Sequence, residues 1–515
     1  MPPASVPHAP RRASAHGPTA PRTRFALALA CASVLATAPR VASAQSAPGL
    51  LSRADSVLLY EVLSAEDRRD AGAAALTAGE AHADARIAHI ARRARARLSD
   101  STFAARTTLG LADATRPLPS YPEPEWAGRY RALGGRDGDC EPLIAALDDS
   151  AAQVRQRAIV LAGQRRSCMG NAAVRARLGT IIRDGSTRTA SRQPPAPSWQ
   201  LAADALVTMA RVAPDSARDA AQRLSRHQQP QLRRAAARAA TLLRDTTMLI
   251  RLSGDRDGNV TEAAVSGLAT VAGHAEDARY RRLLRSTTPQ VALAAAEALK
   301  GSPDPQTKAA ATEELARRVA RNWASERDIR NALRAAMGEP ASEPWQAGRP
   351  DSLPWDVVAL ALGERRYVQV QMSRLHGGRA FTVELRGDIA PIQGARVLAH
   401  VRSGRYNGTT WHRVEPNFVI QGGSPHDNEY SGSGRFIVDE LGSIAHPRGT
   451  VGMSTRGHST GDLQWFVNLR DNARLVGAYT VFAVVVDGME HVDDVMEGDE
   501  IYVMREVSAP RRAQP

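Results

Sequence analysis

The side chains that most often carry out catalysis show no recognisable arrangement over most of this sequence. Histidines after residue 399 lack the spacing, on one helix or turn, that a metal site needs: His400, His412, His426, His446, His458 and His491. The glycines of 422–423 and 432–434 lack the Gly-Lys-Ser/Thr context of a phosphate-binding loop. No serine lies in a nucleophile elbow. We therefore expect chemistry that needs no metal, cofactor or covalent intermediate.

Three short blocks in the last third of the chain do suggest a site: His412-Arg-Val414, Phe418-Val-Ile-Gln-Gly-Gly423 and Gln464-Trp-Phe466. Arg413 alone would be an ordinary surface arginine, but its place between His412 and Val414, shortly before Phe418, favours a function. The two phenylalanines could be plain core residues. Gln421 has a glycine pair behind it and is harder to explain by packing alone.

These blocks belong to a longer series that includes Phe381-Thr-Val-Glu-Leu385, Ala390-Pro391, Tyr406-Asn-Gly-Thr-Thr-Trp411 and Tyr479-Thr-Val-Phe482. In order and spacing, residues 365–507 resemble the cyclophilin-type peptidyl-prolyl cis-trans isomerases. The resemblance implies three catalytic residues: Arg413, Phe418 and Gln421. It also implies a substrate-binding set: Val419, Ser454, Thr455, Gln464, Phe466, Leu475 and Tyr479.

The chemistry of the family explains these residue types. Amide resonance opposes rotation about an X-Pro bond with a barrier of about 18–20 kcal/mol, so a catalyst needs only to stabilise the twisted amide. A fixed guanidinium can donate hydrogen bonds to the prolyl nitrogen or hold the neighbouring carbonyl. Apolar side chains can clamp the proline ring while the other side turns. The expected partners are therefore proline-containing polypeptides.

Several positions depart from the family pattern. Leu463 replaces a usual serine, Met453-Ser-Thr455 replaces Met-Ala-Asn, and Arg474 stands where a large aromatic is common. Tyr479 lies where many members have histidine. These changes predict a shallower pocket and altered preference for residues that flank proline. They leave an alternative open, a catalytically weak scaffold that only binds proline-containing segments.

The elements after residue 356 alternate apolar and polar residues, as in Tyr367–Met372 and Phe381–Leu385, which predicts half-buried strands. Further short strands are expected after these, among them Thr410–Val414 and Phe436–Asp439, with glycine turns between strands. Together with two helices, near 388–403 and 489–496, they predict a closed antiparallel barrel over residues 357–507. The resemblance implies eight strands. Residues 508–515 are expected to be a disordered tail, and the proline-rich residues 339–356 a linker.

Residues 45–338 are rich in alanine and arginine, with apolar residues at helical spacing. Leu232, Ala236 and Ala240 align with Val260, Ala264 and Leu268, and then with Val291, Ala295 and Leu299, at offsets of 28 and 31. This pattern resembles HEAT-like helical repeats, which stack because one helix pair cannot bury its own apolar stripe. A non-repeating all-α bundle is the alternative. A protein partner is expected on this helical surface.

Residues 1–44 have the form of a secretory signal peptide: five arginines and no acid, an apolar stretch from Phe25 to Ala38, and Ala42-Ser43-Ala44 before the expected cleavage site. We therefore predict an exported, periplasmic or secreted folding catalyst, without a stable membrane span. A lipoprotein anchored at Cys31 is less favoured. Export allows Cys140 and Cys168 to pair in a disulfide, although two free buried thiols are the equal alternative.

The net charge of +13 comes from 67 basic and 54 acidic residues, but only Lys300 and Lys308 are lysines. Such a skew indicates an arginine-rich background and not a dedicated basic patch. We therefore expect no nucleic-acid partner.

Overall fold

The computed structural model describes residues 51–68, 70–99, 117–187, 199–341, 355–361, 364–372, 378–441 and 444–510. The predicted signal peptide, residues 342–354 of the predicted linker and the end of the predicted tail lie outside these ranges. Among the described residues, no helix is both long and apolar enough to cross a membrane.

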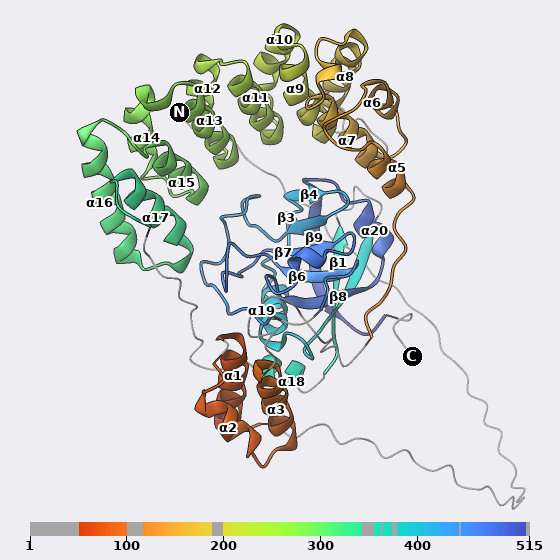
Figure 1. Ribbon diagram of the computed structural model, residues 1–515, viewed down its shortest axis with the longest axis vertical. Helices are drawn as coiled ribbons and strands as arrows, with labels where there is room; N and C mark the ends of the chain where they lie inside the picture. Colours follow the sequence, from red (N-terminus) through yellow and green to blue (C-terminus); the bar gives the residue numbers. More distant parts are fainter. Residues whose placement is uncertain are drawn as a thin grey trace, which may run out of the picture. The chain divides into compact units, whose positions relative to one another are not determined.

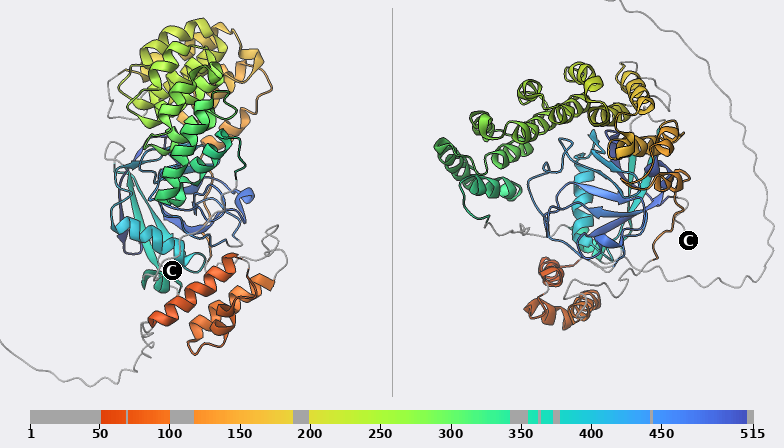
Figure 2. Two further views of the ribbon diagram at one scale, coloured as in Figure 1. Left: turned by 90° about the vertical axis from the view of Figure 1, so that its left-hand side faces the viewer. Right: turned by 45° about the horizontal axis from the view of Figure 1, so that its top comes forward.

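Most of the helices follow one another in sequence as pairs, placed side by side in a curved row (Figures 1 and 2). They are α5 (Trp126–Ala132), α6 (Glu141–Ala146), α7 (Ala152–Ala162), α8 (Ala172–Gly185), α9 (Trp199–Val212), α10 (Pro214–Leu224), α11 (Pro230–Leu242), α12 (Thr246–Leu252), α13 (Gly258–Val271), α14 (Asp277–Leu283), α15 (Pro289–Ala298), α16 (Pro305–Arg321) and α17 (Arg327–Ala336). Three short 3-10 turns, η1 (Arg166–Cys168), η2 (Gly273–Glu276) and η3 (Ala324–Glu326), join some of them.

The second helices of successive pairs, α7, α9, α11, α13, α15 and α17, pack on one another along the row. The residues aligned in the sequence are buried in these helices or directly after them: Leu232, Ala236, Ala240, Val260, Ala264, Leu268, Val291, Ala295 and Leu299. Small side chains matter here, because a Cβ on Gly267 of α13 would overlap Thr241 of α11. The repeated packing positions of the sequence are therefore the helix contacts of the structure.

Polar residues cap the N-termini of several helices of the row, α8, α12, α13 and α16. Asp257 caps α13, since its carboxylate accepts hydrogen bonds from the backbone N–H of Asn259 (3.0 Å) and Val260 (3.1 Å). The neighbouring Asp255 accepts two hydrogen bonds from the Arg233 guanidinium of α11, at 2.7 and 2.8 Å. The polar turn of the sequence thus links one helix pair to the next.

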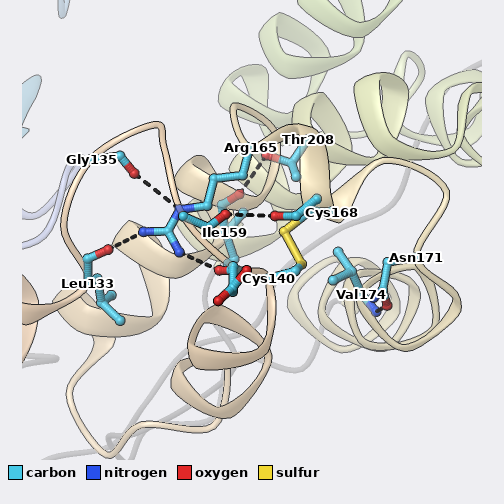
Figure 3. The surroundings of a disulfide bond; sticks show 12 residues. Leu133, Gly135, Cys140, Ile159, Arg165, Cys168, Asn171, Val174 and Thr208 are labelled. Atoms are coloured by element: carbon cyan, nitrogen blue, oxygen red, sulfur yellow. Dashed lines mark hydrogen bonds between the residues drawn. A yellow bond between two sulfur atoms is a disulfide. The ribbon is translucent and has the colours of Figure 1, made fainter.

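Cys140 and Cys168 meet near the start of this row (Figure 3). Cys140, at the start of α6, is joined to Cys168 of η1 by a disulfide with a Cα–Cα distance of 5.1 Å. Beside it, the Arg165 guanidinium donates hydrogen bonds to the carbonyls of Leu133, Gly135 and Asp139. Covalent and polar links therefore tie the loop before α6 to the turn after α7.

Three helices that precede the row in the sequence have different neighbours. α1 (Arg53–Arg68), α2 (Ala74–Glu80) and α3 (Ala85–Ser99) pack on one another. Their apolar residues, such as Leu59 and Ile90, belong to the same hydrophobic core as the C-terminal sheet and α18 (Trp355–Ala361). α6–α17 build a separate core, and Trp126 and Ala127 of α5 pack with Val154 in a small cluster of their own. The uniform helical region expected over 45–338 is thus divided between two cores.

The C-terminal region is one curled antiparallel sheet of nine strands in the order β3-β9-β1-β2-β8-β6-β7-β5-β4. The strands are β1 (Arg366–Met372), β2 (Ala380–Leu385), β3 (Thr409–Thr410), β4 (Arg413–Glu415), β5 (Val419–Gly422), β6 (Thr450–Met453), β7 (Trp465–Asn468), β8 (Val481–Asp487) and β9 (Glu500–Val507). α19 (Pro391–Arg402) and α20 (Met489–Asp493) are the two helices predicted within this region. The N-terminus of α19 is capped by the Glu440 carboxylate, which accepts the N–H of Ile392 and Gln393.

The closed eight-stranded barrel is not confirmed. In the described residues β3 and β4 are the two ends of the sheet, and a single bridge, Thr410 to Ser424, reaches from β3 past β5. A single strand was expected from Thr410 to Val414. It is interrupted because the backbone of Trp411 pairs with Gly498 and Asp499 instead. The strand expected at Phe436–Asp439 forms only an isolated bridge.

Both regions fall in one compact unit, Leu50–Pro515. Side chains near the starts of the second helices reach the C-terminal region in turn. Gln153 of α7 donates to the Asp493 carbonyl (3.0 Å), Gln200 of α9 to the Glu497 carbonyl (2.7 Å), and Asn259 of α13 to the His426 carbonyl (3.0 Å). The helical row therefore contacts the sheet region through the N-terminal ends of its second helices.

Candidate active site

One cavity of about 390 Å³ lies in the C-terminal region. All ten residues predicted for catalysis or substrate binding line it: Arg413, Phe418, Val419, Gln421, Ser454, Thr455, Gln464, Phe466, Leu475 and Tyr479. Sequence blocks that lie far apart in the chain thus converge on one place. Their individual roles stay predictions.

The sheet register places the key side chains in a row. Arg413 of β4 pairs with Gln421 of β5, Gln421 pairs with Phe466 of β7, and Phe466 pairs with Gly452 of β6. Directly paired residues in a sheet project toward the same face. A guanidinium, an amide and an aromatic ring are therefore neighbours because of strand pairing alone.

The Arg413 guanidinium is held from several sides at the cavity rim. Its Nε donates to Glu415 Oε1 (2.9 Å), as does Nη2, and its Nη1 donates to Gln421 Oε1 (3.3 Å). A second carboxylate, Glu429 Oε1, lies 3.5 Å from Nη1. The side chain remains 39% exposed. The arginine is thus oriented by neighbours and still accessible to a ligand.

Two buried glutamines form a chain behind the arginine. Gln421 Nε2 donates to Gln464 Oε1 (3.0 Å), and Gln464 Nε2 donates to the carbonyls of Asn428 (2.9 Å) and Ser431 (2.7 Å). These bonds fix which way each amide points, because an amide nitrogen can only donate. The Gln421 carbonyl oxygen is therefore left facing Arg413.

An apolar floor completes the cavity. Val419, Phe466 and Leu475 are buried together, with Phe418 and Tyr479 partly buried against them. The Phe466 and Tyr479 rings meet edge to face with centroids 5.6 Å apart. The Arg474 guanidinium lies 4.0 Å over the Phe418 ring, so the departure from an aromatic residue at this position forms a cation–π contact.

His446 supports this floor from behind. Its ring stacks on Phe466, with centroids 6.3 Å apart, and its Nε2 lies 3.1 Å from the Tyr479 carbonyl. Burial lowers the pKa of His446 to about 4. The ring is therefore neutral at pH 7, with Nε2–H as the donor to the carbonyl.

Further lining residues were not among the predicted site residues: Ser325, Glu429, Tyr430, Ser431, Gly432, Phe436, Arg456, Thr460, Asp462 and Arg474. Arg474 had been noted only as a departure from the family pattern. Most of the others lie in loops between the matched blocks, where no periodic pattern marks them. Ser325 comes from η3 in the helical row, so no signal within the C-terminal blocks could have found it. In the part of the chain that the structure describes, no group of three or more His, Cys, Asp or Glu side chains could hold a metal.

Comparisons with known proteins agree with this geometry. The family model "Cyclophilin type peptidyl-prolyl cis-trans isomerase/CLD" matches residues 367–509. Peptidyl-prolyl cis-trans isomerase B of Bacillus subtilis is 36% identical over 135 residues, which cover 26% of this chain and 92% of that protein. The peptidyl-prolyl cis-trans isomerase of Acinetobacter baylyi is 35% identical over 121 residues, covering 22% of this chain and 64% of that one.

Among solved structures, a cyclophilin type peptidyl-prolyl cis-trans isomerase of Cryptosporidium parvum is similar, with 24% identity and a TM-score of 0.26. The match covers 28% of this chain and 100% of that one. The sequence matches to the bacterial relatives carry the assignment. The chain belongs to the cyclophilin-type peptidyl-prolyl cis-trans isomerase family.

Proposed function

We propose that the cavity accelerates rotation about X-Pro bonds in polypeptide substrates, with Arg413 as the residue that stabilises the twisted bond. One observation supports this most strongly. The register of β4, β5 and β7 places Arg413 and Gln421 beside Phe466 in a single accessible cavity. A cation and an apolar clamp are the two groups that this rotation needs.

The proposed mechanism follows from the groups in the cavity. Val419, Phe466 and Leu475 hold the proline ring, so that one end of the bond is fixed. As the amide twists, its nitrogen lone pair localises and becomes a hydrogen-bond acceptor. The Arg413 guanidinium, pre-oriented by Glu415 and Gln421, donates to it. Because the guanidinium is already in place, little reorganisation is needed.

A protease-coupled assay on a prolyl tetrapeptide tests the proposal. We expect Arg413→Ala to lower kcat/KM by about 100-fold or more, since it removes a preorganised donor. Arg402→Ala is a matched control, because Arg402 of α19 is 42% exposed and does not line the cavity. Equal rates for wild type and Arg413→Ala would reject Arg413 as the catalytic group.

The alternative is a scaffold that binds proline-containing segments with little turnover. Arg474 over Phe418 and Leu463 in place of serine are the observations in its favour. Isothermal titration with a non-cleaved prolyl peptide separates the two possibilities. Binding without acceleration of isomerisation would favour the scaffold.

We also propose that the protein is exported and assists folding of other proteins. The signal-peptide pattern of residues 1–44 supports export, and so does the Cys140–Cys168 disulfide, because such bonds persist in oxidising compartments. N-terminal sequencing of the protein from its own cell should give Gln45. Acceleration of a proline-limited refolding reaction, lost in Arg413→Ala, would support the folding role.

For the helical row we propose HEAT-like repeats that bind a protein partner. The repeated packing positions support this interpretation. The starts of several second helices already contact the chain's own C-terminal region, so a partner would use the remaining helical faces. Reversing the charge of exposed side chains on α10 should weaken capture of the partner. The same kind of change at exposed positions of the sheet region should leave this capture unaltered.

A further inference from the structure

One residue that lines the cavity comes from the helical row and not from the isomerase region. Ser325 of η3 lines the cavity together with Arg413 and Phe466. Its hydroxyl lies 3.7 Å from where a Cβ on Gly434 would be, so η3 abuts the 432–434 loop. A residue outside the family-matched range is therefore positioned to meet whatever occupies the cavity.

A second residue of the helical row acts on the same wall through an ion pair. Asp328, at the start of α17, pairs with Arg456, with Oδ2 3.0 Å from Nε. The Arg456 guanidinium also donates to the Glu429 carbonyl (2.6 Å) and lies 5.0 Å over the Tyr430 ring. Arg456, Glu429 and Tyr430 all line the cavity. Asp328 thus acts on Arg456 directly, and on Glu429 and Tyr430 only through Arg456.

These contacts lead directly to the predicted catalytic arginine. The loop that Arg456 holds carries Glu429, whose carboxylate lies 3.5 Å from Arg413. Tyr430 of the same loop packs against the hydrophobic core of the helical row. The position of this loop therefore depends on the helical row as well as on the sheet.

The charges of the cavity explain what Asp328 contributes. Three guanidiniums line the cavity, from Arg413, Arg456 and Arg474, against the carboxylates of Glu429 and Asp462. Asp328 supplies a further negative charge at the Arg456 end. Without it, that end would be more positive.

We propose that Ser325 and Asp328 are specificity-determining residues of the isomerase, through which the helical row selects the side chains that flank the substrate proline. Ser325 limits the size of the flanking side chain by direct contact. Asp328 is a positioning residue that also offsets the charge of Arg456. This inference rests on the proposed isomerase function and adds a second part of the chain to its substrate site.

The charge arm of the test uses the full-length chain and tetrapeptides with Glu, Ala or Lys directly before proline. We expect Asp328→Ala to raise the ratio of kcat/KM for the Glu peptide over the Lys peptide by about threefold to fivefold, an effect that added salt reduces. Asp328→Asn, which keeps the side-chain volume, should do the same. Glu313→Ala is the matched control, because Glu313 of α16 pairs with Arg285 and Arg317 and does not line the cavity.

The size arm uses Ser325→Trp, with Ser216→Trp on exposed α10 as its control. We expect Ser325→Trp to lower kcat/KM for a Phe-Pro peptide relative to an Ala-Pro peptide by about threefold or more, mainly through KM. Thermal unfolding of each variant checks that the fold is kept. Unchanged ratios in both arms, in an enzyme whose activity still depends on Arg413, would overturn the inference. Equal activity of Arg413→Ala and wild type would instead reject the proposed function itself.

Discussion

Arg413 has five N–H donors, and its usefulness depends on how its neighbours share them. Glu415 takes hydrogen bonds from Nε and Nη2, while Gln421 takes one from Nη1. Glu415 thus fixes the plane of the guanidinium, and Gln421 fixes the position of its Nη1. A carboxylate on this side also reduces the net charge that a substrate meets.

The first prediction concerns Glu415. Glu415→Ala should lower kcat/KM by about tenfold, because the guanidinium loses its main orienting partner. Glu415→Gln should recover part of the activity, since its amide oxygen can still accept. The peptide assay measures both variants. Loss of protein stability without this rescue would indicate a merely structural role for Glu415.

The second prediction concerns His446, whose pKa is lowered to about 4 by burial. The unfolded chain, with a histidine pKa near 6.5, takes up protons that the folded state refuses. His446 therefore does not lower the free energy of unfolding above about pH 6.5. Below that, its contribution makes the free energy of unfolding fall as the pH drops toward 4. His400 and His412, also lowered to about 4, act in the same direction. Asp204, raised to about 6, acts in the opposite direction.

Denaturant unfolding between pH 7 and 4 measures this effect. His446→Gln should reduce the proton uptake on unfolding near pH 5 by about one proton. An unaltered pH slope in His446→Gln would contradict the assignment.

At the scale of elements, the third prediction follows from Gly452 in β6. A Cβ there would lie 2.8 Å from Cε2 and 2.9 Å from Cε1 of Phe466, and closer still to Cζ. Gly452→Ala should therefore displace the ring from the cavity floor, lowering both kcat/KM and stability, the latter by about 1–3 kcal/mol. Gly128→Ala in α5, where nothing lies within 4 Å of the new Cβ, should be neutral or stabilising. Equal changes of kcat/KM and of stability in Gly452→Ala and Gly128→Ala would reject this explanation.

How far the sequence predicts each element depends on whether the signal is local. The alternation in Tyr367–Met372 marks β1, and the small residues of α11 and α13 mark helix packing, because both patterns belong to single elements. The end of the sheet could not be predicted in this way. Trp411 interrupts the expected strand by pairing with Gly498 and Asp499, which lie far away in the sequence.

The site residues likewise divide into those that a local sequence signal marks and those that it does not. The blocks around Arg413, Gln421 and Phe466 could be aligned with a family, and strand register then brings them together. Ser325 could not be predicted, because its contact with the cavity depends on how η3 packs against a loop more than 100 residues later. Predictions from motifs thus reach only as far as the matched region.

At the scale of the whole molecule, the helical row and the isomerase region share a polar interface. Gln153, Gln200, Asn259 and Asp328 are each the second residue of their helix, and each contacts the C-terminal region. These helices pack on one another along the row, so their first turns reach the same C-terminal region one after another. The interface is therefore built from many small contributions, and its strongest charged contact offers the clearest test.

That contact is the ion pair between Arg234 of α11 and Glu497, with Nη2 2.5 Å from Oε1 and both side chains largely buried. Removing Glu497 would leave the partly buried Arg234 without its ion-pair partner, so each single alanine variant should destabilise the full chain. In a double-mutant cycle the coupling between the two residues should reach about 1 kcal/mol or more, measured by urea unfolding. The more exposed pair Arg379–Asp494, within the isomerase region, should show a smaller coupling energy. A coupling no larger than in this surface pair would mean that the ion pair does not hold the two regions together.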